Sequence, residues 1–122
     1  MDKQMDNKRK TGKSYEELAV KYLQDKGYFI IEKNFQVRQG EIDIIARDNS
    51  TIVFVEVKYR ASSTSGHPLE AVTYGKMKKI CKSALFYMNK NKISPDNTSI
   101  RFDVIGILGH EITHIENAFD FV

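Results

Sequence analysis

Apolar residues recur at helical spacing in two stretches of the chain. In the first, Ser14 can cap a helix with Glu17 three positions later, and apolar positions then repeat until Gly27. The second predicted helix runs from about Leu69 to about Asn89 and has an apolar stripe along one side. Short runs rich in Ile, Val and aromatic residues predict strands at residues 28–31, 41–46, 52–58, 100–108 and 111–115.

The order of these elements predicts an α/β or α+β domain in which helices flank a mixed central sheet of about five strands. A polar connection is expected over residues 32–39, and a turn at residues 47–50 joins two strands into an antiparallel hairpin. The chain has 122 residues, 41% of them apolar, which suits one core and therefore a single domain over residues 14–122. Residues 1–13 are polar and basic, and their lack of apolar periodicity predicts a flexible tail.

The net charge of +3 conceals an uneven distribution along the chain. Residues 58–92 contain eight basic residues and one acidic residue, whereas the segments on either side are net acidic. This asymmetry favours a surface that faces a polyanion, although a solvated lysine-rich helix face would give the same count. The candidate nucleic-acid contacts are Arg38, Arg60, Lys76 and Lys79.

Several classes of protein are excluded by composition. A single cysteine, Cys81, cannot form an internal disulfide, and its apolar neighbours indicate a core residue in a reducing compartment. No apolar run approaches the roughly 20 residues that cross a bilayer, and the charged N-terminus lacks the apolar stretch of a secretory signal. We therefore expect a cytoplasmic protein without a membrane partner.

The predicted hairpin carries two acidic residues in strands that are apolar on both faces. Such strands lie in the centre of a sheet, where an unpaired carboxylate is costly, so Asp43 and Glu56 should be paired or bind a cation. The predicted turn places them opposite one another, with Cβ atoms roughly 5 Å apart. They could then share Mg²⁺ or Mn²⁺, while Lys58 on the Glu56 face steadies a developing negative charge or an attacking water.

A structural network would explain the same residues. Glu56 and Lys58 could form a simple ion pair, and Asp43 could accept backbone N–H bonds from a neighbouring segment. Strict alternation in the first strand of the hairpin would also place Ile42 and Ile44 together on the face opposite Asp43. Spacing alone leaves the metal site and the structural network open.

The hairpin residues resemble a known nuclease signature. Asp43, followed across the hairpin by Glu56-Val57-Lys58, resembles the PD-(D/E)xK motif without its proline. More closely, the chain resembles the YraN family, small bacterial proteins similar to Holliday junction resolvases and restriction-endonuclease-like domains. The resemblance covers nearly everything after residue 11. Its segments are Gly40-Glu41-Ile42-Asp43, Phe54-Val55-Glu56-Val57-Lys58 with Arg60, Gly66-His67-Pro68 with Glu70-Ala71-Val72 and Lys76, Arg101-Phe102-Asp103-Val104, and Asn117-Ala118-Phe119.

The resemblance implies a restriction-endonuclease-like core and a role for each matching residue. The metal ligands would be Asp43 and Glu56, with the carbonyl of Val57 as a third. The catalytic lysine would be Lys58. Glu16 matches a further catalytic glutamate that archaeal-type resolvases present from their first helix. The residue before that glutamate departs from the family, which usually has glycine where this chain has tyrosine.

These implications lead to an expected function and its alternatives. The leading expectation is an endodeoxyribonuclease that depends on Mg²⁺ or Mn²⁺ and acts on DNA, including branched DNA. A homodimer is a further expectation, because a four-way junction is two-fold symmetric. The main alternative is a nucleic-acid-binding or adaptor module that keeps the fold without the chemistry. A third is a domain that binds only proteins.

Overall fold

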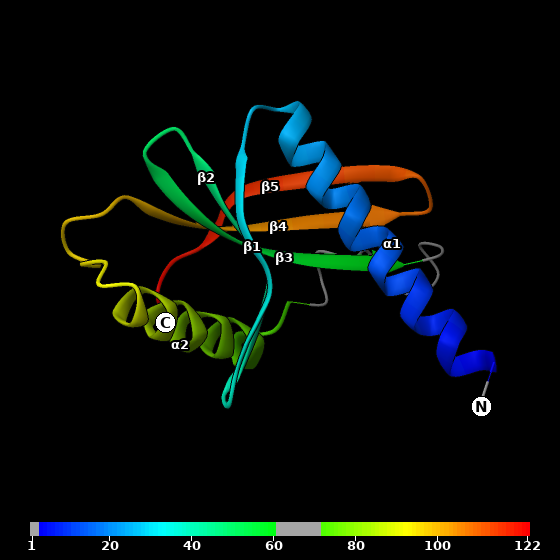
Figure 1. The fold of residues 1–122 in the computed structure, drawn as a ribbon, viewed down its shortest axis with the longest axis horizontal. Helices are drawn as coiled ribbons and strands as arrows, with labels where there is room; N and C mark the ends of the chain where they lie inside the picture. The colour runs from blue at the N-terminus through cyan, green and yellow to red at the C-terminus, as the bar shows by residue number, and fades with distance from the viewer. Residues whose placement is uncertain (1–2, 61–71) are drawn as a thin grey trace.

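A computed structural model describes residues 3–60 and 72–122, with the side chains of residues 14–60 and 72–122. Its elements in chain order are α1 (Lys3–Asp25), β1 (Phe29–Val37), β2 (Gly40–Asp48), β3 (Thr51–Arg60), α2 (Tyr74–Lys90), β4 (Ile100–Leu108) and β5 (Glu111–Phe119) (Figure 1). The predicted α/β class, with helices flanking a five-stranded mixed sheet, is confirmed. Within the described residues, neither helix is both long enough and apolar enough to cross a membrane.

The strands lie in the sheet in chain order, β1-β2-β3-β4-β5. The first three form an antiparallel meander, and the predicted hairpin is its β2–β3 half. β4 runs parallel to β3, which requires a crossover connection, and α2 lies within that crossover. β5 returns antiparallel to β4 as the other edge strand. This topology is compatible with a restriction-endonuclease-like core.

Both helices differ from the sequence prediction at their N-terminal ends. α1 begins at Lys3 rather than Ser14, so residues 3–13, expected as a flexible tail, belong to the helix. Lys, Gln, Met and Arg make up most of this segment and have high helix propensity, which favours a helix even without an apolar stripe. In the described part of the chain, α2 begins at Tyr74, and the side chain of Thr73 caps it by accepting from the backbone N–H of Lys76. The loop and helix start predicted over residues 62–71 lie outside the described residues.

The edge strands are longer than predicted. β1 continues through most of residues 32–39, which were expected to form a polar connection, and β5 continues beyond residue 115 to Phe119. An edge strand leaves much of its surface in solvent, so it tolerates polar side chains that would be excluded from a central strand. Phe35 is nevertheless 5% exposed, which ties the second half of β1 to the core.

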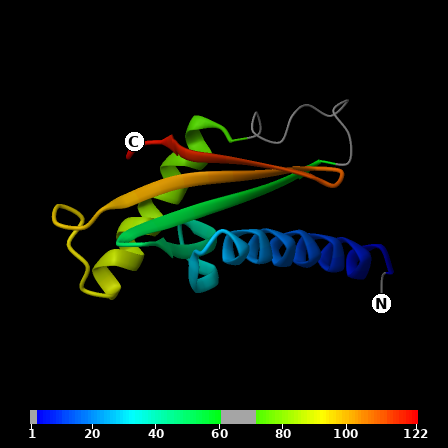
Figure 2. The same ribbon diagram turned by 90° about the horizontal axis from the view of Figure 1, so that it is seen from above.

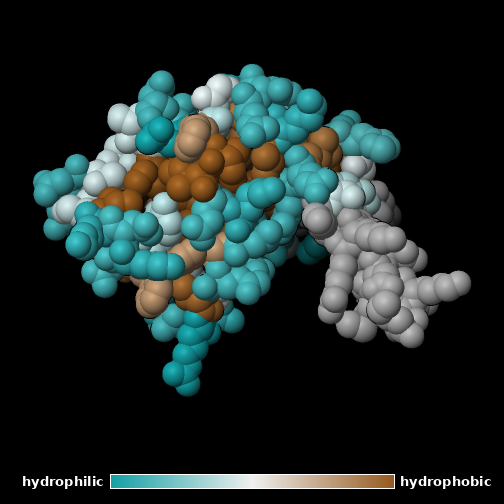
Figure 3. Space-filling view, in the orientation of Figure 1, coloured by the Kyte–Doolittle hydropathy of each residue, from teal (hydrophilic) through white to brown (hydrophobic). Residues whose placement is uncertain are grey.

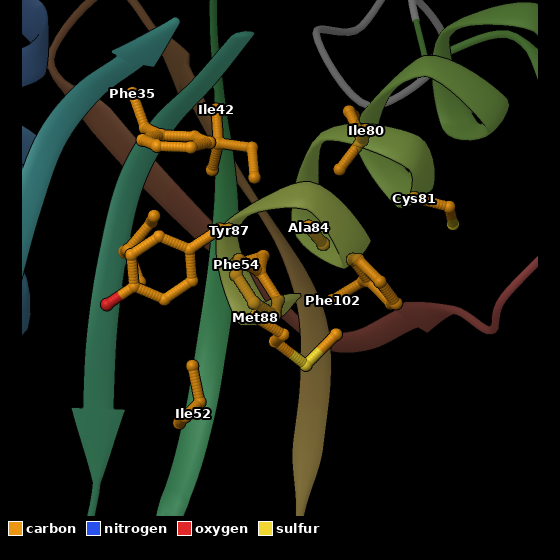
Figure 4. Packing of buried hydrophobic residues seen from close by; sticks show 11 residues of the cluster. Phe35, Ile42, Ile52, Phe54, Ile80, Cys81, Ala84, Tyr87, Met88 and Phe102 are labelled. Carbon is orange, nitrogen blue, oxygen red and sulfur yellow. The ribbon is translucent and has the colours of Figure 1, made fainter. Parts of the chain in front are cut away.

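The two helices cover opposite faces of the sheet, and Figure 2 shows α1 running along one side of the strands. The cluster on the α2 face is drawn in Figure 4 and contains Phe35, Ile42, Ile45, Ile52, Phe54, Ile80, Cys81, Ala84, Tyr87, Met88 and Phe102. The cluster on the α1 face contains Ala19, Leu23, Tyr28, Ile44, Ala46, Val53, Val55, Ile105 and Ile107. β2 and β3 contribute to both clusters, so they are central strands with two buried faces, as their composition predicted.

Candidate functional site

The register of the β2–β3 hairpin brings the two acidic residues together. The pairs run from Asp48 with Thr51 to Ile44 with Val55, which is the predicted register. One step further along, the backbone N–H of Val57 donates to Oδ2 of Asp43 at 2.8 Å. The carboxylate of β2 therefore holds the backbone of β3 next to Glu56. This is a bond from a backbone N–H of a neighbouring segment, as the structural-network alternative for Asp43 predicted.

The alternation predicted for β2 is wrong at Asp43. Ile42 packs in the α2-side cluster with Ile45, whereas Ile44 packs on the α1 side. The neighbouring strand is also irregular here, because Asn34 has a left-handed φ of 53° between the positions that pair with Ile44 and Ile42. Asparagine tolerates this conformation better than most residues. Asp43 lies at the point where the side chains of β2 change the face to which they point, opposite this irregularity in β1.

Glu56 is a buried carboxylate with one oxygen engaged and one without a partner. It is 4% exposed, and its Oε1 lies 3.4 Å from Nζ of Lys58 and 3.7 Å from Nζ of Lys76. Lys58 comes from the same strand, and Lys76 comes from the first turns of α2. Oε2 of Glu56 is buried and finds no hydrogen-bond partner among the described residues. Because an unsatisfied buried carboxylate oxygen is costly, this atom is suited to accept a cation.

The pKa values of the two carboxyl groups are also consistent with a site for a cation. Burial, reinforced by the charge of Asp43, raises the pKa of Glu56 to about 7, although Lys76 and Lys58 oppose the shift. Burial also raises the pKa of Asp43 above its usual range, against the stabilising bond from the Val57 N–H. Two desolvated carboxylates so close together repel one another unless a positive charge lies between them. The two side chains therefore have the chemistry to share a divalent cation.

We expect Glu56→Gln to stabilise the metal-free protein at alkaline pH. Because the pKa of Glu56 is raised from 4.5 to about 7 on folding, the protein loses stability as pH rises between these values. Glutamine stays neutral, so in EDTA the variant should exceed wild type at pH 8 by on the order of 2–3 kcal/mol in free energy of unfolding. At pH 5 the two should be nearly equal. Urea titrations at both pH values measure this, and a variant less stable than wild type at pH 8 would contradict it. Glu32→Gln, at an exposed carboxylate of β1, is the control and should change neither value.

Glu16 lies on α1 near the same pair. Its carboxyl is half-buried, and its pKa is raised by burial and then by the charge of Asp43. The preceding Tyr15 stacks on Tyr59 of β3, with ring centroids 3.6 Å apart, so the helix accommodates its ring against the sheet. Within residues 14–60 and 72–122, however, no three acidic, histidine or cysteine side chains are grouped closely enough to hold a metal ion. Glu16 is therefore a neighbour of the pair and does not complete a three-carboxylate cluster.

Three of the four predicted nucleic-acid contacts line one groove. It lies between the tip of the β1–β2 hairpin and α2, has a volume of about 350 Å³, and is lined by Gln36, Val37, Arg38, Gln39, Gly40, Glu41, Lys76 and Lys79. Gly40 lies against α2 here, because a Cβ added to it would be in van der Waals contact, at 3.4 Å, with Cβ of Lys79. Arg60 is instead at the end of β3, where its guanidinium donates to the carbonyl of Tyr59. Lys76 joins this groove to the acidic pair through Glu56.

A second buried polar cluster, on the α1 face, was not predicted. Asp103 is fully buried in β4 and accepts hydrogen bonds from Nε and a terminal nitrogen of Arg101 at 2.9 and 3.0 Å. The Asn117 N–H, at 3.0 Å, and Nε2 of His114, at 2.7 Å, also contact this carboxylate. An acidic residue inside the predicted strand at residues 100–108 was the available signal, and it is the same signal that singled out Asp43. These bonds connect β4 to β5, so the cluster is a structural one that stabilises the packing of the two strands.

The comparisons with known proteins agree on a single family. The sequence model of the uncharacterised protein family UPF0102 matches residues 15–107. A UPF0102 protein of Persephonella marina is 50% identical over 109 residues, covering 89% of this chain and 92% of the relative. One from Lachnoclostridium phytofermentans is 46% identical over 114 residues, covering 93% and 96%. A third, from Thermodesulfovibrio yellowstonii, is 50% identical over 108 residues, covering 88% and 94%. The names of these relatives state a family and no activity.

Proposed function

The chain belongs to the UPF0102 family, the YraN family that its motifs resemble, and from its site we propose that it is a metal-dependent endonuclease acting on DNA in the cytoplasm. The observation that carries this proposal is the pair of buried carboxylates, Asp43 and Glu56, beside two lysines. The partnerless Oε2 of Glu56 and the raised pKa values of both groups favour occupation by Mg²⁺ or Mn²⁺. The basic groove next to the pair favours a phosphodiester substrate.

Each residue of the site has a distinct part in this proposal. Asp43, Glu56 and the Val57 carbonyl would hold the cation, which when bound supplies positive charge to the phosphodiester undergoing hydrolysis. Lys58 is partly buried, and its ammonium group, 3.4 Å from Oε1 of Glu56, can stabilise charge on the phosphate or orient a water. Lys76 contacts the same oxygen of Glu56, so it orients this carboxylate. Glu16 would position a water close to Asp43.

Incubation of the purified protein with defined DNA substrates tests the proposal. The substrates are a four-way junction, a nicked duplex, an intact duplex and a single strand, each with Mg²⁺, Mn²⁺ or EDTA. Cleavage that requires a metal and both carboxylates supports the endonuclease. Salt-sensitive binding that survives Asp43→Ala, with no cleavage of any substrate, would instead support the adaptor alternative. Sedimentation with and without the junction would test for a homodimer.

The basic groove leads to a prediction about binding. Replacing both Arg38 and Lys79 by Ala should weaken duplex binding in EDTA about tenfold at low salt. The plot of log affinity against log salt falls with a steepness of about 0.9 per phosphate contact. The double variant, which loses two contacts, should therefore give a plot that is shallower by about 2. Fluorescence anisotropy over a range of salt concentrations measures both effects. Replacing Lys21 and Arg47, which are exposed outside the groove, removes the same charge and should leave the slope nearly unchanged. Equal losses in the two double variants would show that only the net charge matters.

A further inference from the structure

The seam between α2 and the β1–β2 hairpin continues beyond the basic groove. A second hollow of about 360 Å³ adjoins it and is lined by Gln39, Lys82, Leu85, Phe86 and Asn89. Gln39 belongs to both hollows, so the two are contiguous at the hairpin tip. In Figure 1 this tip lies beside α2, and Figure 3 shows a polar tip with apolar surface next to it.

The side chains along this seam form one stripe of α2. Lys79, Lys82 and Phe86 are spaced three and four residues apart, which places them on the same side of a helix. Lys76 begins the stripe at the acidic pair. From Lys76 to Phe86 the helix rises about 15 Å, which is the length of roughly four stacked nucleotides.

Phe86 is the unusual member of this stripe. Its side chain is 51% exposed, and the neighbouring Leu85 is 44% exposed. The ring of Phe86 is backed by that of Phe35, with centroids 6.5 Å apart, so it has a fixed support on its inner side. An isolated exposed aromatic residue needs no explanation. Here, however, two large apolar side chains line a hollow together with Lys82, at the end of a row of cations.

We propose that this seam binds one unpaired strand of DNA, whose phosphates follow Lys76, Lys79 and Lys82 and whose base stacks on Phe86. Cationic grooves that end on an exposed aromatic face are the usual means of holding a single strand. A base inside a duplex has both faces covered by its neighbours, so along a DNA strand the base that stacks on this ring is an unpaired one. This inference rests on the proposed function and narrows its substrate class to DNA with an unpaired strand next to the site of cleavage.

Binding measurements in EDTA test the inference separately from cleavage. The full-length protein is titrated into a labelled splayed fork, a blunt duplex of equal length and an oligo(dT) strand. We expect Phe86→Ala to weaken fork and oligo(dT) binding by about fivefold to 150-fold, the effect of removing one base–aromatic stack. Binding of the blunt duplex should change less than twofold. Phe86→Leu keeps an apolar side chain against Phe35 and should give the same discrimination with an unchanged melting temperature.

Phe29→Ala is the matched control. Phe29 is 60% exposed, but it lies at the start of β1, at the other end of this strand from the hairpin tip and the seam. This variant should leave all three affinities unchanged. Equal losses on fork and duplex, or no loss with either Phe86 variant, would overturn the inference. Competition by poly-glutamate as strong as that by oligo(dT) would also overturn it, because the seam would then be a site for acidic peptides. If no substrate is cleaved but the discrimination is observed, the proposed catalysis fails and the strand-binding seam stands.

Discussion

Asp43→Asn is expected to reduce the rate of metal-dependent DNA cleavage by about a thousandfold or more. Asparagine has nearly the same shape, and its side-chain oxygen can still accept the 2.8 Å bond from the Val57 N–H. The fold should therefore persist while half of the carboxylate charge that would hold the cation is lost. A cation contributes several kcal/mol of charge stabilisation to phosphodiester hydrolysis, and about 4 kcal/mol corresponds to a thousandfold in rate.

Single-turnover cleavage with protein in excess over a four-way junction measures this effect without a contribution from product release. Lys58→Ala should lower the same rate by a factor of about a hundred, because it removes one charged donor from the transition state. Glu32→Gln removes an exposed carboxylate of β1 and should leave the rate within about twofold of wild type. An Asp43→Asn variant that cleaves within tenfold of wild type would show that the pair is the structural network that its spacing also allows.

The closeness of Asp43 to Glu56 was accessible from the sequence because hairpin register is a local property. A short turn at residues 47–50 determines which positions face one another, and the observed pairs follow it as far as Ile44. The change of facing between Ile42 and Ile44 was not accessible. It coincides with the left-handed Asn34, in a segment whose polar residues gave no strand pattern, so a local rule failed where the neighbouring strand was irregular.

The surroundings of the site depend on tertiary structure and could be predicted only in part. Lys76 stood out as a basic residue of the motif, but its contact with Glu56 requires α2 to cross over the sheet to a parallel β4. Gly40 packs against Lys79 of α2 in the groove, and no periodicity encodes that contact. The exposure of Phe86 could not be predicted, because a helical pattern does not determine which apolar side chain stays uncovered. The acidic residues of the hairpin could therefore be identified from the sequence, whereas the surface formed around them by α2 could not.

Asp103→Asn is expected to lower the free energy of unfolding by about 3–5 kcal/mol, the usual effect of removing one partner from a buried ion pair. All the groups facing Asp103 present positive charge or N–H donors, and an amide can accept fewer of these bonds while adding donors of its own. Arg101 would then remain partly buried with only the more exposed Asp48 and Glu116 as counter-charges. At roughly 4 °C per kcal/mol, the melting temperature should fall by about 10–20 °C.

The pH dependence of this loss separates it from the effects at Glu56. Burial alone would raise the pKa of Asp103, but the bonds from His114, Arg101 and the Asn117 N–H outweigh it and hold the pKa below its usual range. A depressed pKa gives stability that is present above the unfolded value near 4 and is lost as pH falls through the lower folded value. The gap between wild type and Asp103→Asn should therefore be constant from pH 5 to pH 8 and shrink only below about pH 4. Thermal melts across this range measure it, with the exposed Asp96→Asn as a control that should melt like wild type.

If Asp103→Asn melts within 3 °C of wild type, the cluster does not stabilise the packing of β4 against β5. If the variant is destabilised but still cleaves DNA at 10 °C, the cluster acts on the fold alone, because Asp103 faces α1 whereas Glu56 faces α2.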